Sequence, residues 1–280
     1  MYCLQAGSID ERNIRHMAVE KDIYRLKELS ADEANSVLEM FSSGMSPVQQ
    51  RSNEKWMDLL NWIFKIKTQY QDSNLPEAVA DEIERLEFNL CEDIHTAIEN
   101  VGAPYLESLY LKNLGFFENA DDIAKFTFYL MVQYCRTRRM KESLKSFKSF
   151  RGFSVDKAWN VIVLMTATNV GMSIFAEREK WELIGIENLT SVPFLTSDQP
   201  VVNLYAGPRN EESRSLKADE FELYYPLTPK FAVVLKAKAS SYLDYKKLSA
   251  ETIGMLNRKI VEGSELQLFS NSDTCLRVYA

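Results

Sequence analysis

Apolar residues recur at the three-to-four spacing of a helix through most of the first 180 residues. The run from Ala34 to Phe41 follows Ser30 and Glu33, which form a capping box, and ends before Gly44. Comparable start signals predict helices that begin at Pro47, Pro76, Pro104 and Asp121, and a long apolar helix from about Ser154 to Glu179. We therefore expect residues 1–180 to form a helical region.

The pattern changes after Trp181 to short β-rich runs bounded by turn residues. These runs read WELIGIEN, VPFLTS, VVNLY, FELYYPL, KFAVVLKAK, LQLFS and CLRVYA. One helix, from Ser249 to Gly263, interrupts them, and the first residues, MYCLQ, resemble a further strand. Helices followed by strands are typical of an α+β protein. We expect the helical two thirds to pack on a mostly antiparallel sheet formed by residues 181–280, in one continuous compact domain.

Composition limits the class of protein. Of 280 residues, 46% are apolar and 26% charged, which is ordinary for a globular chain, and the net charge of −7 argues against a surface that coats nucleic acid. The four cysteines lie far apart, no export leader is evident, and polar residues interrupt the most apolar window, Ala158–Ala176. These features predict a cytoplasmic protein without a membrane partner.

Common catalytic motifs are absent from the sequence. There is no phosphate-binding P-loop, no G-x-G-x-x-G and no G-x-S-x-G. The two histidines, His16 and His95, are too far apart for a zinc helix, and no Glu-x-Lys follows Asp198 as an acidic nuclease would require. The sequence therefore assigns no metal ligand and identifies no cofactor.

The segment from Arg136 to Arg151 carries seven basic residues and one acidic residue. On a helix, its basic residues form a stripe of candidate contacts for a nucleic acid, another anionic ligand or an acidic protein partner. The candidates are Arg138, Arg139, Lys141, Lys145 and Lys148. The alternative is a solvated helix face that pairs with the acidic surplus elsewhere in the chain.

Arg136 falls on the apolar side of the same helix, one turn after Gln133. A buried arginine must be paired or hydrogen-bonded, so its partner is either a structural carboxylate or a bound anion.

The stretch FLTSDQPVVNLY displays Asp198 between two apolar runs. Asp198 could close an Asx turn, or it could be a catalytic or binding carboxylate at a strand end. Pro200 turns the preceding residue toward extended geometry, and Pro226 and Pro229 mark a second corner downstream.

These stretches resemble an uncharacterised, mainly bacterial family catalogued as a domain of unknown function. FLTSDQPVV is similar to its Thr-Ser-Asp-Asn-Pro-Val stretch, YYPLTP to its Phe-Pro-Leu-Ser-Pro stretch, and MVQYCRTRRM to a helix with Gln and Arg-Thr at the same spacing. The site candidates implied by this resemblance are Gln133, Arg136, Ser197, Asp198, Pro200, Pro226 and Asn257. The family's usual His-Tyr-Val-Pro-type beginning is not found here, so either the start is shortened or this member has lost that element. If that histidine belongs to the family's site, its loss implies a non-catalytic relative.

Three functions remain open. The first is a binding or regulatory module for a phosphate-bearing or anionic ligand, with Arg136, Asp198 and Asn257 in one polar centre, and the family's general character implies a link to bacterial defence. The second is an enzyme acting on a nucleic acid or nucleotide, with Asp198 as general base or metal ligand. The third is a protein-interaction module that uses the basic helix.

Overall fold

The computed structural model describes residues 1–11, 24–69, 76–146, 152–207 and 220–280. The described helices are α1 (Ala31–Ser42), α2 (Pro47–Gln69), α3 (Glu77–Tyr110), α4 (Ala120–Cys135), α5 (Arg138–Ser146), α6 (Val155–Ala176), α7 (Ala250–Gly263) and α8 (Asp273–Arg277), with short 3-10 helices η2 (Gly115–Glu118) and η3 (Arg178–Lys180). The described strands are β1 (Tyr2–Gln5), β2 (Ser8–Glu11), β3 (Trp181–Glu187), β4 (Thr196–Ser197), β5 (Val202–Asn203), β6 (Glu222–Thr228), β7 (Phe231–Ala237) and β8 (Gln267–Ser270).

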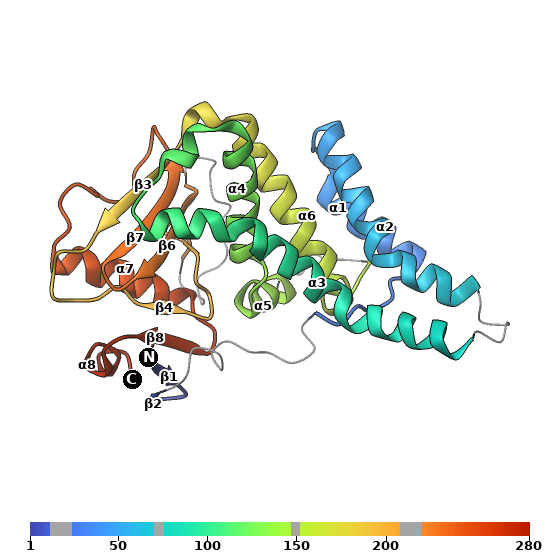
Figure 1. Cartoon of the computed structure of the whole chain (residues 1–280), viewed down its shortest axis with the longest axis horizontal. Helices are drawn as coiled ribbons and strands as arrows, with labels where there is room; N and C mark the ends of the chain where they lie inside the picture. Colours follow the sequence, from blue (N-terminus) through green and yellow to red (C-terminus); the bar gives the residue numbers. More distant parts are fainter. Residues whose placement is uncertain (12–23, 70–75, 147–151, 208–219) are drawn as a thin grey trace.

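The strands form two antiparallel sheets. Their strand orders are β2-β1-β8-β4 and β3-β7-β6-β5. The second sheet packs against the helices through a shared core, while the smaller first sheet lies below it, close to both chain termini (Figure 1). The protein therefore has the expected α+β fold, with its helices mostly N-terminal. Strand β1, however, is N-terminal in sequence and pairs with β8 of the C-terminal region.

Helix starts follow the predicted capping signals. The Ser30 hydroxyl accepts the Glu33 amide hydrogen at 3.2 Å, and the Glu33 carboxylate accepts the Ser30 amide hydrogen at 3.0 Å. Before α2, the Gln49 side chain likewise accepts the Ser46 amide hydrogen at 3.0 Å. These reciprocal bonds satisfy amides that a helix leaves unpaired at its first turn.

A separate helix from Pro104 to Leu114 was expected, and that prediction is wrong. Helix α3 continues through Pro104 as far as Tyr110. The turns on both sides of Pro104 are held by packing, since Tyr105 and Leu109 are buried and the Tyr129 ring of α4 lies against Gly102. Tertiary contacts thus outweigh the one hydrogen bond that the proline removes.

The terminal run CLRVYA was predicted as a strand, but its first three residues form the end of helix α8 and a turn follows them. The Ser272 hydroxyl caps this helix by accepting the Cys275 amide hydrogen at 3.4 Å, and Asp273 pairs with Arg277 one turn later at 3.1 Å. Strand β2 was not predicted. It forms because Ala6 and Gly7 adopt positive φ angles of 50° and 78°, which closes a tight hairpin.

Helix α6 is the centre of the larger core. It packs against α4 on one side and α1 and α2 on another, and most of its side chains are buried. Among the described residues, only α6 is long and apolar enough to cross a membrane, and 72% of its most apolar window is buried inside the protein. Burial of this kind is typical of a core helix.

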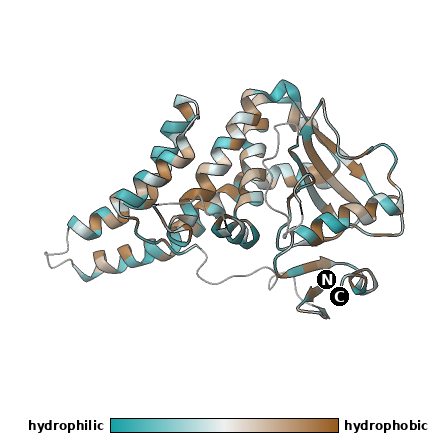
Figure 2. Cartoon of the chain, turned by 180° about the vertical axis from the view of Figure 1, so that it is seen from behind, coloured by the Kyte–Doolittle hydropathy of each residue, from teal (hydrophilic) through white to brown (hydrophobic). Residues whose placement is uncertain are grey.

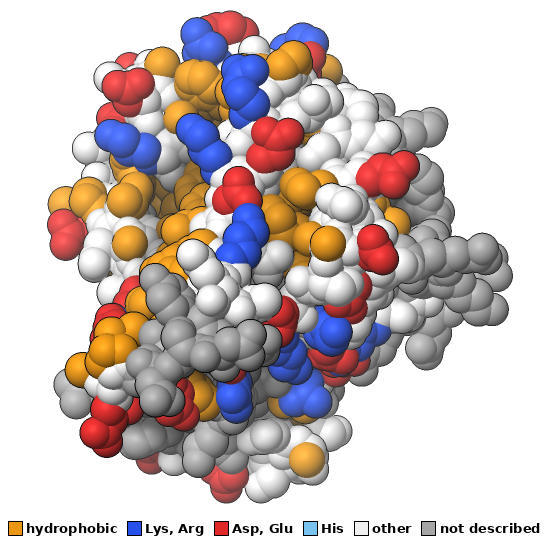
Figure 3. Space-filling view, turned by 90° about the vertical axis from the view of Figure 1, so that its right-hand side faces the viewer, with side chains coloured by type: hydrophobic (Ala, Val, Ile, Leu, Met, Phe, Trp, Pro, Cys, Tyr) orange, Lys and Arg blue, Asp and Glu red, His pale blue; other side chains and the backbone are white. Residues whose placement is uncertain are grey.

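Apolar positions gather in the second sheet and the helices beside it, whereas the helices farther away alternate between hydrophilic and apolar positions (Figure 2). The end of the molecule formed by α1, α2 and α3 shows apolar side chains mixed with both signs of charge (Figure 3). A second, smaller core lies between the sheets and α7, around Leu195, Tyr224 and Leu256.

Candidate functional site around Arg136

Arg136 follows the last residue of α4, and its amide still bonds to the Val132 carbonyl at 3.0 Å. Its Nη2 donates to the Gln133 side-chain oxygen at 2.8 Å, and its Nη1 lies 2.7 Å from the Glu99 carboxylate of α3. The Arg136 side chain is 21% exposed, but that of Glu99 is 51% exposed. The structure therefore contains a mostly buried cation whose counter-ion is a half-exposed carboxylate.

Gln133 and His95 each bury a polar atom beside this cation. Both residues are 5% exposed, and the Gln133 Nε2 and His95 Nδ1 atoms have no hydrogen-bond partner within the described part of the chain. The Arg136 hydrogen bond fixes the orientation of the Gln133 amide, so its unpartnered nitrogen is a donor. Buried donors without partners are uncommon in folded proteins.

His95 is electrically neutral at physiological pH. Burial lowers the pKa of its imidazole to about 4, and the nearby Arg136 charge acts in the same direction. Its ring lies 4.5 Å from the Tyr24 ring, centroid to centroid. The imidazole therefore adds hydrogen-bonding capacity beside Arg136 without a second positive charge.

Tyrosine side chains form the rest of the polar cluster around Arg136. Burial raises the pKa of Tyr24 and Tyr129, while the Arg136 charge acts in the opposite direction. The Tyr225 hydroxyl, from β6, is hydrogen-bonded to that of Tyr129. We call the following set the Arg136 centre: Tyr24, His95, Glu99, Tyr129, Gln133, Arg136 and Tyr225. It joins α3 and α4 to the second sheet.

Asp198 lies elsewhere and is fully engaged by the backbone. Its two carboxylate oxygens accept the amide hydrogens of Glu265 at 3.0 Å and Leu266 at 2.7 Å, and its own amide donates to the Gln267 carbonyl at 3.1 Å. Burial raises the pKa of this carboxyl, although hydrogen bonds from backbone amides, that of Leu266 foremost, and the Arg138 charge oppose that shift. Asp198 thus connects the corner to the loop before β8 rather than closing an Asx turn within its own segment.

Ser197 and Asn257 also contact backbone groups. The Ser197 hydroxyl donates to the Gln199 carbonyl at 2.9 Å and accepts its amide hydrogen at 3.1 Å. The fully buried Asn257 donates to the Pro193 carbonyl at 2.9 Å and accepts the Leu195 amide hydrogen at 2.9 Å. Both side chains therefore shape the segment that leads into the corner.

Gln199 connects this corner to the Arg136 centre, and sequence reasoning did not single it out. Its amide nitrogen donates to the Tyr134 carbonyl at 3.1 Å, and its oxygen accepts the hydroxyl hydrogen of Thr137. Tyr134 and Thr137 bracket Arg136 in sequence. The conformation of the chain at Arg136 thus depends on the corner that carries Ser197 and Asp198. The only signal for this contact in the sequence is that the Arg-Thr and Asp-Gln-Pro stretches both belong to the family resemblance.

A comparison with known proteins gives the family. The profile of a family described as protein of unknown function, DUF4238, matches residues 1–274. The chain belongs to the DUF4238 family. No curated protein and no solved structure matches it significantly. The resemblance noted in the sequence is therefore confirmed at the level of family, and the chemistry of this DUF4238 protein must be argued from its own residues.

The predicted basic stripe of this DUF4238 protein lies on α5, next to the N-terminal end of α6. Lys141 and Lys145 both pair with Asp156 of α6, at 3.2 and 2.9 Å, and Lys145 also contacts Glu142. Arg138 is exposed and Arg139 is partly buried, while Lys148 lies outside the described residues. The two described lysines of the stripe are therefore charge-compensated by acidic neighbours.

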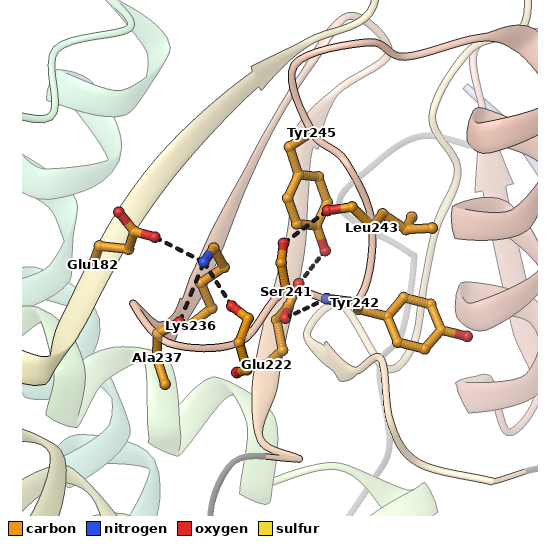
Figure 4. A network of polar contacts seen from close by, with 9 residues as sticks. Glu182, Glu222, Lys236, Ala237, Ser241, Tyr242, Leu243 and Tyr245 are labelled. Carbon is orange, nitrogen blue, oxygen red and sulfur yellow. Dashed lines mark hydrogen bonds and ion pairs between the residues drawn. The ribbon is translucent and has the colours of Figure 1, made fainter.

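A second buried polar network, which the sequence analysis missed, crosses the second sheet. Glu222 of β6 accepts the Tyr242 amide hydrogen at 2.9 Å and the Tyr245 hydroxyl hydrogen (Figure 4). Lys236, its cross-strand neighbour on β7, contacts Glu182 at 2.7 Å and the Ser240 carbonyl at 2.7 Å. The hydrogen bonds of Glu222 and of Lys236 each hold part of the loop that follows β7. The signal in the sequence was a charged residue in each of two otherwise apolar runs.

Two further observations on the DUF4238 chain concern ligand and metal sites. A surface pocket of 430 Å³ opens at the Pro229 corner. Its lining residues are Ser191, Pro193, Thr228, Pro229, Lys230, Asn271 and Ser272. Within the described ranges, no group of three or more His, Cys, Asp or Glu side chains could hold a metal ion.

Proposed function

We propose that this DUF4238 protein is a binding or regulatory module that takes a phosphate-bearing, anionic ligand at the Arg136 centre. The observation that carries the proposal is the pairing of a mostly buried guanidinium with a half-exposed carboxylate, beside a buried amide donor without a partner. A planar guanidinium with several N–H donors is well suited to oxyanions.

The contacts of Asp198 support a role in holding the ligand site in shape. Both of its oxygens already accept backbone amides, and Gln199 next to it fixes the chain around Arg136. A carboxylate held in this way supports the geometry of a ligand site.

Thermal unfolding of the purified protein tests the proposal directly. Inorganic phosphate, pyrophosphate, nucleotides and short single-stranded RNA and DNA would be added in separate series. We expect at least one to raise the midpoint of the wild type, because a ligand that binds the native state stabilises it. Arg136→Met should abolish that rise.

Arg85→Met is the matched control, since Arg85 makes an exposed ion pair with Glu82 on α3, away from the buried cluster. It should keep the full ligand response. If Arg136→Met does not fold, Arg136→Lys, which keeps the charge but loses the planar fork, should show a reduced response. An undiminished response in the folded Arg136 variants would contradict the proposal.

A further inference from the structure

We propose that the anionic group of the ligand is a phosphoryl group that takes the position of the Glu99 carboxylate. It replaces this carboxylate at Arg136 and also accepts a hydrogen bond from Gln133. The inference rests on the proposed function and deepens it, because it names the residue that the ligand displaces and the donors that the phosphoryl group takes.

The Glu99 carboxylate leaves one donor beside Arg136 without an acceptor in the described part of the chain, and a phosphoryl group offers one oxygen more than a carboxylate. Glu99 already presents a carboxylate, and one of its oxygens lies 2.7 Å from Arg136 Nη1. Even so, Gln133 Nε2 has no acceptor within the described chain, although its own oxygen bonds to Arg136 Nη2. A carboxylate has two oxygens, whereas a phosphate monoester has three terminal oxygens in a tetrahedral arrangement. Three oxygens can accept from the guanidinium and from the neighbouring amide together.

Exposure makes Glu99 the exchangeable partner. Its side chain is half exposed, so its carboxylate can be rehydrated by a small rotation, while Arg136 remains largely enclosed. Water solvates the half-exposed Glu99 carboxylate well once it has left the pair, so its departure costs Glu99 little. A buried cation without a counter-ion is costly, so Glu99 leaves Arg136 only as another anion arrives. Ligand binding is therefore an exchange of anions.

Phosphate binding to Glu99→Gln tests the exchange. Calorimetric titrations would use inorganic phosphate, adenosine monophosphate and acetate in a buffer without phosphate. Glu99→Gln should lower the midpoint of unfolding without ligand, because Arg136 loses its counter-ion. The same variant should bind phosphate and the monophosphate about fivefold more tightly than the wild type, because the competing ion pair is gone. Acetate should bind clearly more weakly than either.

Glu82→Gln on the same helix is the matched control, because it removes an exposed ion pair with Arg85. It should change neither the midpoint of unfolding nor the affinity for phosphate. If Glu99→Gln does not fold, Glu99→Asp, which shortens the side chain by one methylene, should still tighten phosphate binding. Tighter binding of the monophosphate than of phosphate identifies an ester as the ligand, and equal binding identifies the free ion. Both results support the phosphoryl assignment, whereas acetate bound as tightly as phosphate overturns it.

The two proposals fail in different ways. If Arg136→Met abolishes phosphate binding while Glu99→Gln leaves the affinity unchanged or weaker, Glu99 is not a competitor. The exchange is then wrong and the proposed function stands. If phosphate and the monophosphate bind the Arg136→Met protein as well as the wild type, the proposed function itself is wrong, and this inference fails with it.

Discussion

The Asp198 carboxylate, at the end of a strand, is hydrogen-bonded to backbone amides of a distant segment. Its two oxygens face two successive amides, Glu265 and Leu266, which lie 67 and 68 residues away in sequence. An ion that accepts two amide hydrogens contributes more than a neutral turn bond, and its loss leaves both donors without a partner. The residue therefore stabilises the contact between the corner and β8.

Replacing Asp198 by Ala should lower the free energy of unfolding by about 2 kcal/mol, because the partly buried Glu265 amide and the Leu266 amide lose a charged acceptor. Urea denaturation would measure it. Asp244→Ala is the control, since the exposed Asp244 accepts only one local amide hydrogen, that of Lys246, and should cost about 0.5 kcal/mol. Equal losses in the two variants would show that Asp198 is an ordinary turn residue.

The lowered pKa of His95 predicts that the stability of the protein depends on pH. Its folded-state pKa of about 4 lies below the ordinary value of 6.5, so the unfolded chain binds the proton more readily between these values. Its contribution is fully present above pH 6.5 and is lost as the pH falls toward 4, by roughly 3 kcal/mol in total.

The variant His95→Gln removes this titration while keeping an uncharged polar side chain. The difference in unfolding free energy between wild type and variant should be constant above pH 6.5 and should shrink as the pH falls to 4. Denaturation curves at several pH values would measure it. A difference that does not vary with pH would show that His95 titrates normally in the folded protein.

At the scale of secondary-structure elements, the contact between α3 and α4 brings Glu99 to Arg136. Gly102, one turn after Glu99, allows this approach: a Cβ atom there would lie 2.3 Å from the Tyr129 ring. Because Tyr129 belongs to the Arg136 centre, the close packing of the two helices and the geometry of the centre depend on the same glycine.

Gly102→Ala should therefore destabilise the protein by about 2 kcal/mol, because the added methyl group overpacks a tight contact. Gly254→Ala on α7 is the control, since no atom of the residues that the structure describes lies within 4 Å of a Cβ at that position. That substitution should stabilise the protein by about 0.5–1 kcal/mol through helix propensity alone. The two midpoints of thermal unfolding should move in opposite directions. A shift of the same sign in both would show that the α3–α4 contact can relax.

Local signals in the sequence predicted most elements but not all of their limits. The caps at Ser30 and Ser249 were readable because capping is a contact between neighbours in sequence. Pro104 was misread as a helix start, since its tolerance depends on packing against α4. Gln133 and Arg136 were found as a polar pair on an apolar face. Glu99 and Gln199 could not be found, because their roles come from contacts with other segments.

At the scale of the whole molecule, the N-terminal segment closes the C-terminal sheet. Strand β1 pairs with β8 over all four of its residues, whereas β4 pairs with the same strand over two. The loop before β8 is also held by Asp198, whose neighbour Gln199 contacts the end of α4. The first residues of the chain are thus linked to the Arg136 centre through β8 and the corner, although they do not belong to that centre.

Deleting residues 1–11 should loosen β8 selectively. Without β1, one edge of β8 loses its hydrogen-bonded partner, so amide exchange at Gln267–Ser270 should accelerate by at least tenfold. The core helix α6 packs against other helices and should keep its protection. Hydrogen exchange followed by mass spectrometry measures both segments in one experiment, with the full chain as the reference. Faster exchange in β8 and α6 alike would mean that the two regions unfold as one unit, and unchanged exchange in β8 would mean that β4 and the Asp198 contacts are sufficient to hold it.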